Sequence, residues 1–187
     1  MELNFTSPMP MSVNDYLGKK VAFVGGKTYV QVYETPKSKQ YKKYMSLLLK
    51  RVMKDSNWTT PSKNEYVVVE CVFYMDKRRK DADNHYKLLL DTLVENNIVL
   101  DDDAILPVTK DILIDTKNPR VEVRIYLSKK VGVFKDEYDY DTFISNNCSN
   151  CKRFNRNCSI LKKAMENRIQ EEIDRDKLIC TKKNAIQ

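Results

Sequence analysis

The feature that most constrains the fold is one amphipathic helix placed inside a run of strands. Residues 66–75 alternate in the manner of a half-buried strand, and two further β segments are predicted at 104–114 and 120–127. Between them, residues 82–95 carry apolar side chains at the helical spacing i, i+3, i+4, i+7, namely Tyr86, Leu89, Leu90 and Leu93. A helix among strands predicts the α+β class: a single small domain with a mixed β-sheet and packed helices.

Two more elements are predicted ahead of this core. Residues 21–24 and 29–33 form a hairpin, because Gly25-Gly26 accepts the positive φ angles of a tight turn. Residues 38–54 predict a helix with apolar side chains on one side and lysines elsewhere. Cys71, inside a predicted strand, is most simply a small buried hydrophobic residue.

The chain is basic, with a formal net charge of +7 over 187 residues. A compact basic protein suits an acidic partner, of which nucleic acid is the commonest; the other interpretation is a basic surface that is merely solvated. No apolar run has the length of a membrane span, and residues 1–4 lack the basic start and apolar stretch of a signal peptide. We therefore expect a cytoplasmic protein that does not associate with a membrane.

The residues with evident chemistry lie at the start of the predicted helix 82–95 and just after its end. Asp81 and Asp83 stand two residues apart, Lys87 follows one turn later, and an acidic run occupies 101–103. Carboxylate oxygens are hard ligands that suit Mg²⁺ and its shared substrate phosphates. This pattern, with the basic run that precedes it, predicts a metal-dependent phosphodiesterase centre.

Structural interpretations compete with a metal site at these residues. Asp81 or Asp83 can cap the helix N-terminus, where negative charge is favoured. Lys87 can form an ordinary i, i+4 ion pair with Asp83. Capping accounts for one aspartate, but not for the second or for the later acidic run. A calcium loop is excluded, because Tyr86 stands where such a loop requires glycine.

The order and spacing of these residues resemble the signature of the RusA-type Holliday junction resolvases. The resemblance covers roughly residues 8–127. Its motifs are Pro-x-Ser-x-Asn-x-Tyr at 10–16, Arg-Arg-Lys-Asp-Ala-Asp-Asn at 78–84, Lys87, Asp91-x-Leu93 and Leu100-Asp101-Asp102. One position departs from the family pattern, since Asn97 stands where the family usually has glycine. Asparagine tolerates the left-handed conformation, so we expect the helix end to be intact.

The resemblance implies a homodimeric endodeoxyribonuclease, dependent on Mg²⁺ or Mn²⁺ and often encoded by phages or prophages. Such enzymes cut four-way DNA junctions by paired symmetric nicks, in DNA recombination and repair. Asp81, Asp83 and Asp102 would be the metal-binding catalytic carboxylates, and Lys87 the catalytic lysine. The residues expected to contact DNA are Asn14, Tyr16, Lys19, Lys20, Lys77, Arg78, Arg79 and Lys80. Two alternatives stay open: a non-catalytic protein that binds branched DNA, and a flap or fork nuclease with the same metal site.

The cysteines gather in the part of the chain that the resemblance does not cover. Four of the five are Cys148, Cys151, Cys158 and Cys180. A Cys-x2-Cys pair is a natural clamp for Zn²⁺, and four thiolates complete a closed tetrahedral site. An iron–sulfur cluster and free thiols are the alternatives.

The same part of the chain predicts a helix over 159–174, which would carry the chain away from the other cysteines. Cys180 would then return over a few extended residues, which is barely within reach. We predict three regions: a nuclease domain over 1–130, an acidic linker over 131–147, and a cysteine-rich, metal-binding helical appendage over 148–187.

Overall fold

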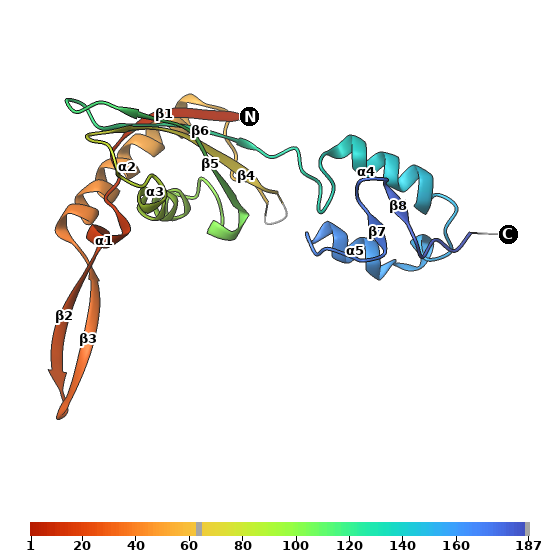
Figure 1. Ribbon diagram of the computed structural model, residues 1–187, viewed down its shortest axis with the longest axis horizontal. Coiled ribbons are helices and arrows are strands. Elements are labelled where there is room, and N and C mark those ends of the chain that lie inside the picture. Colours follow the sequence, from red (N-terminus) through yellow and green to blue (C-terminus); the bar gives the residue numbers. More distant parts are fainter. Residues whose placement is uncertain (63–64, 186–187) are drawn as a thin grey trace. The chain divides into compact units, whose positions relative to one another are not determined.

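The computed structural model describes residues 1–62 and 65–185 (Figure 1). The chain forms two compact units, Met1–Leu127 and Ser128–Gln187. Within the described residues, no helix is both long enough and apolar enough to cross a bilayer.

The first unit is built on one mixed four-stranded sheet, which confirms the predicted α+β class. Its strands are β1 (Glu2–Pro8), β6 (Arg120–Leu127), β4 (Val67–Met75) and β5 (Ile105–Ile114), hydrogen-bonded in that order. β6 pairs antiparallel with both β1 and β4, whereas β4 and β5 are parallel. The parallel pair is joined through α3 (Asp83–Glu95), which is the crossover that parallel neighbours require.

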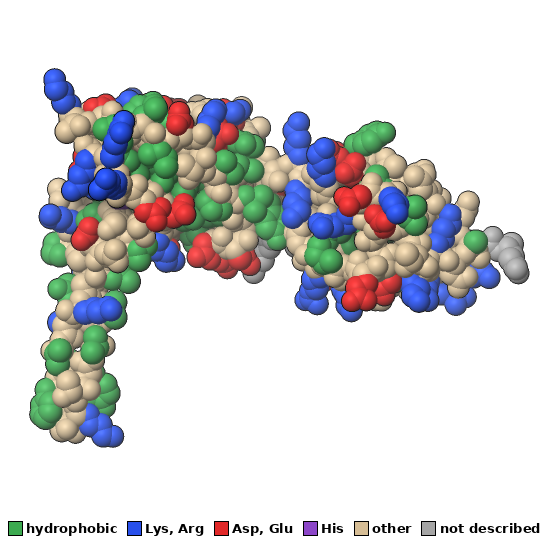
Figure 2. Space-filling model, in the orientation of Figure 1, with side chains coloured by type: hydrophobic (Ala, Val, Ile, Leu, Met, Phe, Trp, Pro, Cys, Tyr) green, Lys and Arg blue, Asp and Glu red, His purple; other side chains and the backbone are tan. Residues whose placement is uncertain are grey.

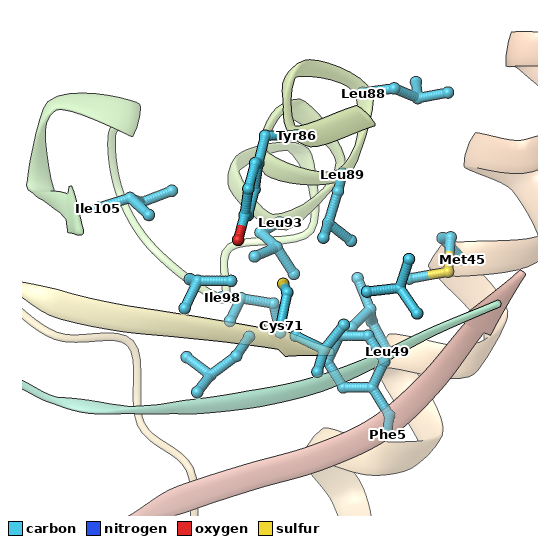
Figure 3. Packing of buried hydrophobic residues seen from close by; sticks show 14 of the residues in the cluster. Phe5, Met45, Leu49, Cys71, Tyr86, Leu88, Leu89, Leu93, Ile98 and Ile105 are labelled. Atoms are coloured by element: carbon cyan, nitrogen blue, oxygen red, sulfur yellow. The ribbon is translucent and has the colours of Figure 1, made fainter. Parts of the chain in front are cut away.

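The core of this unit lies between the sheet and two helices, α2 (Pro36–Asp55) and α3. The predicted face of β4 is buried along its whole length, and Cys71 is fully buried within it. Figure 3 shows Met45 and Leu49 of α2, with Leu89 and Leu93 of α3, packed around Cys71. The apolar faces of the strand and the two helices, which their sequence periodicities predicted, therefore pack together in one layer.

The predicted hairpin is a two-stranded ribbon, β2 (Leu17–Val24) paired with β3 (Lys27–Glu34). Gly25 and Gly26 close it, with φ angles of 59° and 77° that favour glycine. A short helix, α1 (Val13–Tyr16), leads into the ribbon. Apolar side chains such as Val21 are exposed along it, and Figure 2 shows them interspersed with basic ones.

The C-terminal end of α3 is intact, as predicted. Asn97 has a φ of 55°, and the Ile98 N–H donates to the Leu93 carbonyl at 3.0 Å. This is the 6→1 bond of a left-handed helix stop. Buried Ile98 and Val99 then lead to η1, a 3₁₀ turn over Asp102–Ala104, and so to β5.

The second unit corrects the predicted linker over 131–147. That region contains α4 (Glu137–Phe143) and a π-helical turn, η2 (Ile144–Cys148). The Asp136 carboxylate caps α4 by accepting the Asp139 N–H at 3.0 Å, and Phe143 is fully buried. The acidic residues thus begin a helix, whose apolar side chains complete a core of the second unit.

The predicted helix over 159–174 is also wrong, because α5 spans only Ser159–Met165. Asn167 has a φ of 60°, and the Arg168 N–H donates to the Lys163 carbonyl at 3.0 Å, which stops the helix. A small antiparallel pair follows, β7 (Ile173–Asp174) with β8 (Ile179–Cys180). A further short 3₁₀ turn, η3 (Phe154–Arg156), precedes α5. The helical appendage is therefore only partly as predicted.

Candidate active site

Asp81 and Asp83 lie at the start of α3, in the segment between β4 and that helix. The Asp83 N–H donates to Asp81 Oδ1 at 3.1 Å, and both aspartates are exposed. This bond satisfies one of the amide groups that a helix N-terminus leaves unpaired. The capping interpretation thus describes part of what Asp81 does, while the Asp83 side chain faces solvent one residue beyond the cap position, Ala82.

Lys87 lies on α3 and contacts the acidic run 101–103. Its Nζ is 2.7 Å from Asp91 Oδ1 and 3.7 Å from Asp102 Oδ2. The i, i+4 partner of Lys87 is therefore Asp91, in place of the expected Asp83. These contacts raise the pKa of Lys87, chiefly through the hydrogen bond to Asp91, with Asp102 adding to the effect. A charged ammonium group is thus held between Asp91 and Asp102.

Asp91 was not among the expected site residues, although it lies in the motif and four residues from Lys87. Its second oxygen, Oδ2, accepts the Tyr16 hydroxyl at 3.0 Å. Tyr16 is only 5% exposed, so the expected direct contact between this side chain and DNA does not fit the structure. Burial raises the pKa of Tyr16, which keeps the hydroxyl a donor. Tyr16 therefore holds Asp91, and Asp91 holds Lys87.

The base of the ribbon is attached to the helices by Lys42 of α2. Its Nζ lies 2.6 Å from Glu34 Oε1 and also contacts Glu95 of α3. The same ammonium lies 5.4 Å from the centre of the Tyr16 ring, a cation–π contact. This network joins β3, α2 and the far end of α3, and it surrounds the tyrosine that supports Asp91.

His85 fixes the other side of α3. The ring is buried, and its Nδ1–H donates to the Pro10 carbonyl, since a carbonyl oxygen can only accept. The bond holds the segment that precedes α1 against the start of α3. The early Pro-x-Ser-x-Asn-x-Tyr motif therefore lies beside the start of α3, which carries Asp83.

The expected DNA-binding residues other than Tyr16 are exposed. Asn14 lies on α1, and Lys19 and Lys20 lie on β2. The run Lys77–Lys80 follows β4, where Arg79 has a φ of 65° and Lys80 Nζ lies 2.8 Å from Asp76 Oδ1. A non-glycine residue in the left-handed region is uncommon, so this basic loop has a specific shape just ahead of Asp81.

The donor set at α3 and η1 suits Mg²⁺ by its chemistry, because it consists of carboxylate oxygens. The carboxylates are not gathered around one point, since among the described residues no three His, Cys, Asp or Glu side chains are placed to hold one metal ion. Lys87 supplies the positive charge between Asp91 and Asp102. The structure therefore brings Lys87 next to Asp102, and Asp81 next to Asp83 at the start of α3, without forming a closed metal site.

The four expected cysteine ligands all lie in the second unit. Cys148 ends η2, Cys151 and Cys158 flank η3, and Cys180 ends β8. All four line one small cavity. They form a cluster of their own, made within the second unit alone.

Comparison with known proteins assigns the first unit. The family model for endodeoxyribonuclease RusA matches residues 8–126, which include α1, the ribbon, α3, η1 and the strands around them. Comparison with curated proteins gives no match. The matched region is more than half of the 187-residue chain, and it contains each of the residues grouped around Lys87. The chain belongs to the RusA family of endodeoxyribonucleases, which indicates an enzyme that binds branched DNA and resolves Holliday junctions.

Proposed function

We propose that this protein is a Mg²⁺-dependent endonuclease that resolves four-way DNA junctions by paired symmetric nicks, acting as a homodimer. The observation that carries the proposal is the position of Lys87, 2.7 Å from Asp91 and 3.7 Å from Asp102, one helical turn after Asp83. A cation held between the half-buried Asp91 and the exposed Asp102, inside the region matched by a nuclease family, suits phosphodiester hydrolysis.

Asp81, Asp83 and Asp102 are the residues that would hold the metal. Their exposure leaves them accessible to a phosphate group from solvent. Mg²⁺ bound there would polarise phosphate oxygens and lower the pKa of a water molecule. Mn²⁺ has similar preferences for oxygen ligands and should substitute for it.

Lys87 has a separate task in this proposal. Its ammonium would stabilise the extra negative charge that develops on the phosphate in the transition state, because a preorganised cation needs little reorganisation at that moment. Asp91 keeps the ammonium in place, and Tyr16 keeps Asp91 in place. Both are positioning residues, and neither needs to touch the substrate.

Binding would depend on phosphate contacts by the exposed basic residues. Lys77, Arg78 and Arg79 lie just before the carboxylates, and Lys19 and Lys20 extend the positive charge along the ribbon. Phosphate contacts position a protein on DNA but do not read sequence. We therefore expect junction shape to dominate selection, with affinity that falls steeply as salt rises.

Two active sites are needed to cut a two-fold symmetric junction on opposite strands. A symmetric homodimer provides them with a single gene product. The proposed dimer follows from this requirement of the substrate and from the family.

The test is cleavage of labelled four-way, three-way, flap and linear duplex DNA with Mg²⁺, with Mn²⁺ and with a chelator. We expect metal-dependent cutting that is fastest on the four-way junction. Tight junction binding without cleavage in either metal would favour a non-catalytic binding protein. Faster cutting of flaps or forks would favour a nuclease of different substrate range.

A further inference from the structure

A cluster of four thiols lies in the second unit, outside the region matched by the nuclease family. Cys148, Cys151, Cys158 and Cys180 all line a cavity of about 20 Å³, which is room for about one water-sized sphere. Cys148 and Cys151 are buried, and the other two are half-buried. The fifth cysteine, Cys71, is in the core of the first unit and takes no part.

The short α5 is what brings Cys180 to the other three thiols. Because α5 stops at Met165, the chain turns back and β8 places Cys180 beside Ile173 of β7. A continuous helix to residue 174 would have carried the chain about 24 Å away. Cys180 therefore lies near the other three thiols because of the way the second unit folds, and its spacing in the sequence did not predict this position.

Asn147 fixes the two ends of the cluster to each other. This side chain is 5% exposed and is adjacent to Cys148 at the end of the π-helical turn. Its Oδ1 accepts the Cys180 N–H at 2.9 Å, and its Nδ2–H donates to the Phe143 and Leu178 carbonyls, each at 2.9 Å. A buried amide with these three bonds holds Cys180 in register with Cys148.

Cys151 is held at the cavity by a backbone donor. Its Sγ accepts the Asn184 N–H at 3.4 Å. The thiol lines the same cavity as the other three cysteines.

The size of the unit gives a reason for a metal. The second unit has about 60 residues, a size at which a hydrophobic core alone gives marginal stability and a disulfide, a metal or a partner often adds to it. All of the cysteines are free thiols. The core that they accompany is small and consists of Val133, Phe134, Phe143, Cys148, Ile160, Ala164 and Ile173.

We propose that Cys148, Cys151, Cys158 and Cys180 bind one structural Zn²⁺ ion that stabilises the second unit. The four sulfurs are not yet at ligating distances, since the described residues contain no ready group of three metal ligands. Tetrahedral zinc–thiolate geometry requires sulfurs about 3.8 Å apart. Binding would contract the cavity and release the thiol protons, so that metal affinity and folding of the unit are coupled.

Titration of the full-length reduced protein with Co²⁺, and then with Zn²⁺, tests the proposal directly. We expect the visible absorption of tetrahedral thiolate Co²⁺ to saturate at about one equivalent, and Zn²⁺ to displace it. This readout does not depend on cleavage or DNA binding, so it can fail while the proposed nuclease activity holds. Zinc analysis of the purified protein should give about one ion per chain.

Matched variants separate ligands from neighbours. Single substitutions of the four cysteines to serine should abolish the Co²⁺ absorption, whereas Cys71→Ala should keep it. Asn147→Ala should weaken Zn²⁺ binding about 10- to 100-fold, the effect seen when a residue supporting metal ligands is removed. Asn146→Ala, an exposed neighbour, should bind like the wild type.

Thermal unfolding gives an independent readout, because the single tryptophan lies in the first unit. Zn²⁺ should raise the melting temperature of the second unit, which hydrogen exchange of that unit's amides measures. The melting temperature of the first unit, measured by Trp58 fluorescence, should not change. The proposal is overturned by a colourless Co²⁺ titration together with thiols that alkylate equally fast with and without Zn²⁺. A brown protein that contains iron and sulfide would overturn the choice of zinc.

Discussion

Three carboxylates and a lysine are the residues on which cleavage should depend. We predict that Asp81→Asn, Asp83→Asn and Asp102→Asn each lower the single-turnover cleavage rate by about 100-fold or more. Each change would remove a proposed metal ligand with almost no change in volume. Junction binding, measured with Ca²⁺ in place of Mg²⁺, should be unchanged or tighter, because a negative charge near phosphate is lost.

The acidic run 101–103 provides the control for these variants. Asp101 and Asp103 are exposed like Asp102, but of the three only Asp102 forms an ion pair with Lys87. Asp101→Asn and Asp103→Asn should therefore be much milder. If Asp101 proves essential and Asp102 dispensable, the assignment is wrong by one residue. If all five variants lose folding, these residues are structural.

Lys87 should affect catalysis more than binding. We predict that Lys87→Ala lowers kcat by about 100- to 1000-fold, with a smaller change in junction affinity, since a group that acts in the transition state affects kcat. Lys43→Ala, which removes an exposed lysine of α2, controls for the loss of one charge. Equal effects of the two substitutions on kcat would show that Lys87 forms only an ordinary surface ion pair.

The spacing of residues predicted which side chains gather, but not how they pair. Lys87 has an aspartate four residues away on each side, at Asp83 and Asp91, and helical spacing alone does not select between them. The structure selects Asp91, because Tyr16, 75 residues away in sequence, hydrogen-bonds to its other oxygen. Tyr16 itself belonged to the early motif, yet its burial could not be foreseen from a motif.

At the scale of elements, Lys42 joins α2 to β3 and α3. We predict that Lys42→Met lowers the free energy of unfolding of the first unit by about 1 kcal/mol, because the salt-bridge network is lost while the aliphatic stem remains. Urea unfolding followed by Trp58 fluorescence measures it. Lys43→Met, on the exposed side of the same helix, should have little effect.

The effect of Lys42→Met should also depend on pH. The hydrogen bond from Lys42 holds the pKa of Glu34 below its ordinary value of 4.5. A carboxyl with a lowered pKa stabilises the fold above its unfolded pKa, and that contribution is lost as pH falls through the folded value. The stability difference between wild type and Lys42→Met should thus shrink between about pH 6 and about pH 3. A constant difference would show that Glu34 is not the relevant partner.

The strands and helices of the first unit could be predicted because the spacing of their apolar residues in the sequence matches the positions that are buried in the fold. β4 alternates between core and intermediate positions throughout, and α3 buries Leu89 and Leu93 as expected. In the second unit, Leu161, Met165, Ile169 and Ile173 have a helical spacing, but α5 ends before Ile169, which is 64% exposed. The left-handed conformation of Asn167 ends α5. The spacing of apolar residues cannot predict the backbone angle of a single residue.

At the scale of the whole molecule, the chain combines a domain of the RusA family with a second unit that the family match does not cover and that contains four of the five cysteines. The RusA match covers residues 8–126, and the first unit ends at Leu127. The predicted linker failed because acidic, tyrosine-rich sequence without apolar periodicity still folds when Asp136 caps a helix and Phe143 completes a small core. Short elements with few core residues leave little pattern in the sequence.

The most direct measurement of the central claim is cleavage of a supercoiled plasmid that extrudes a cruciform, with Mg²⁺ present. A dimer with two active sites should convert the plasmid straight to linear product, because both nicks occur within one binding event. Mixed dimers of wild type and Asp83→Asn should give nicked circles instead. Failure of the wild-type protein to cut the cruciform in Mg²⁺ or Mn²⁺, although it binds the junction, would contradict the proposed function.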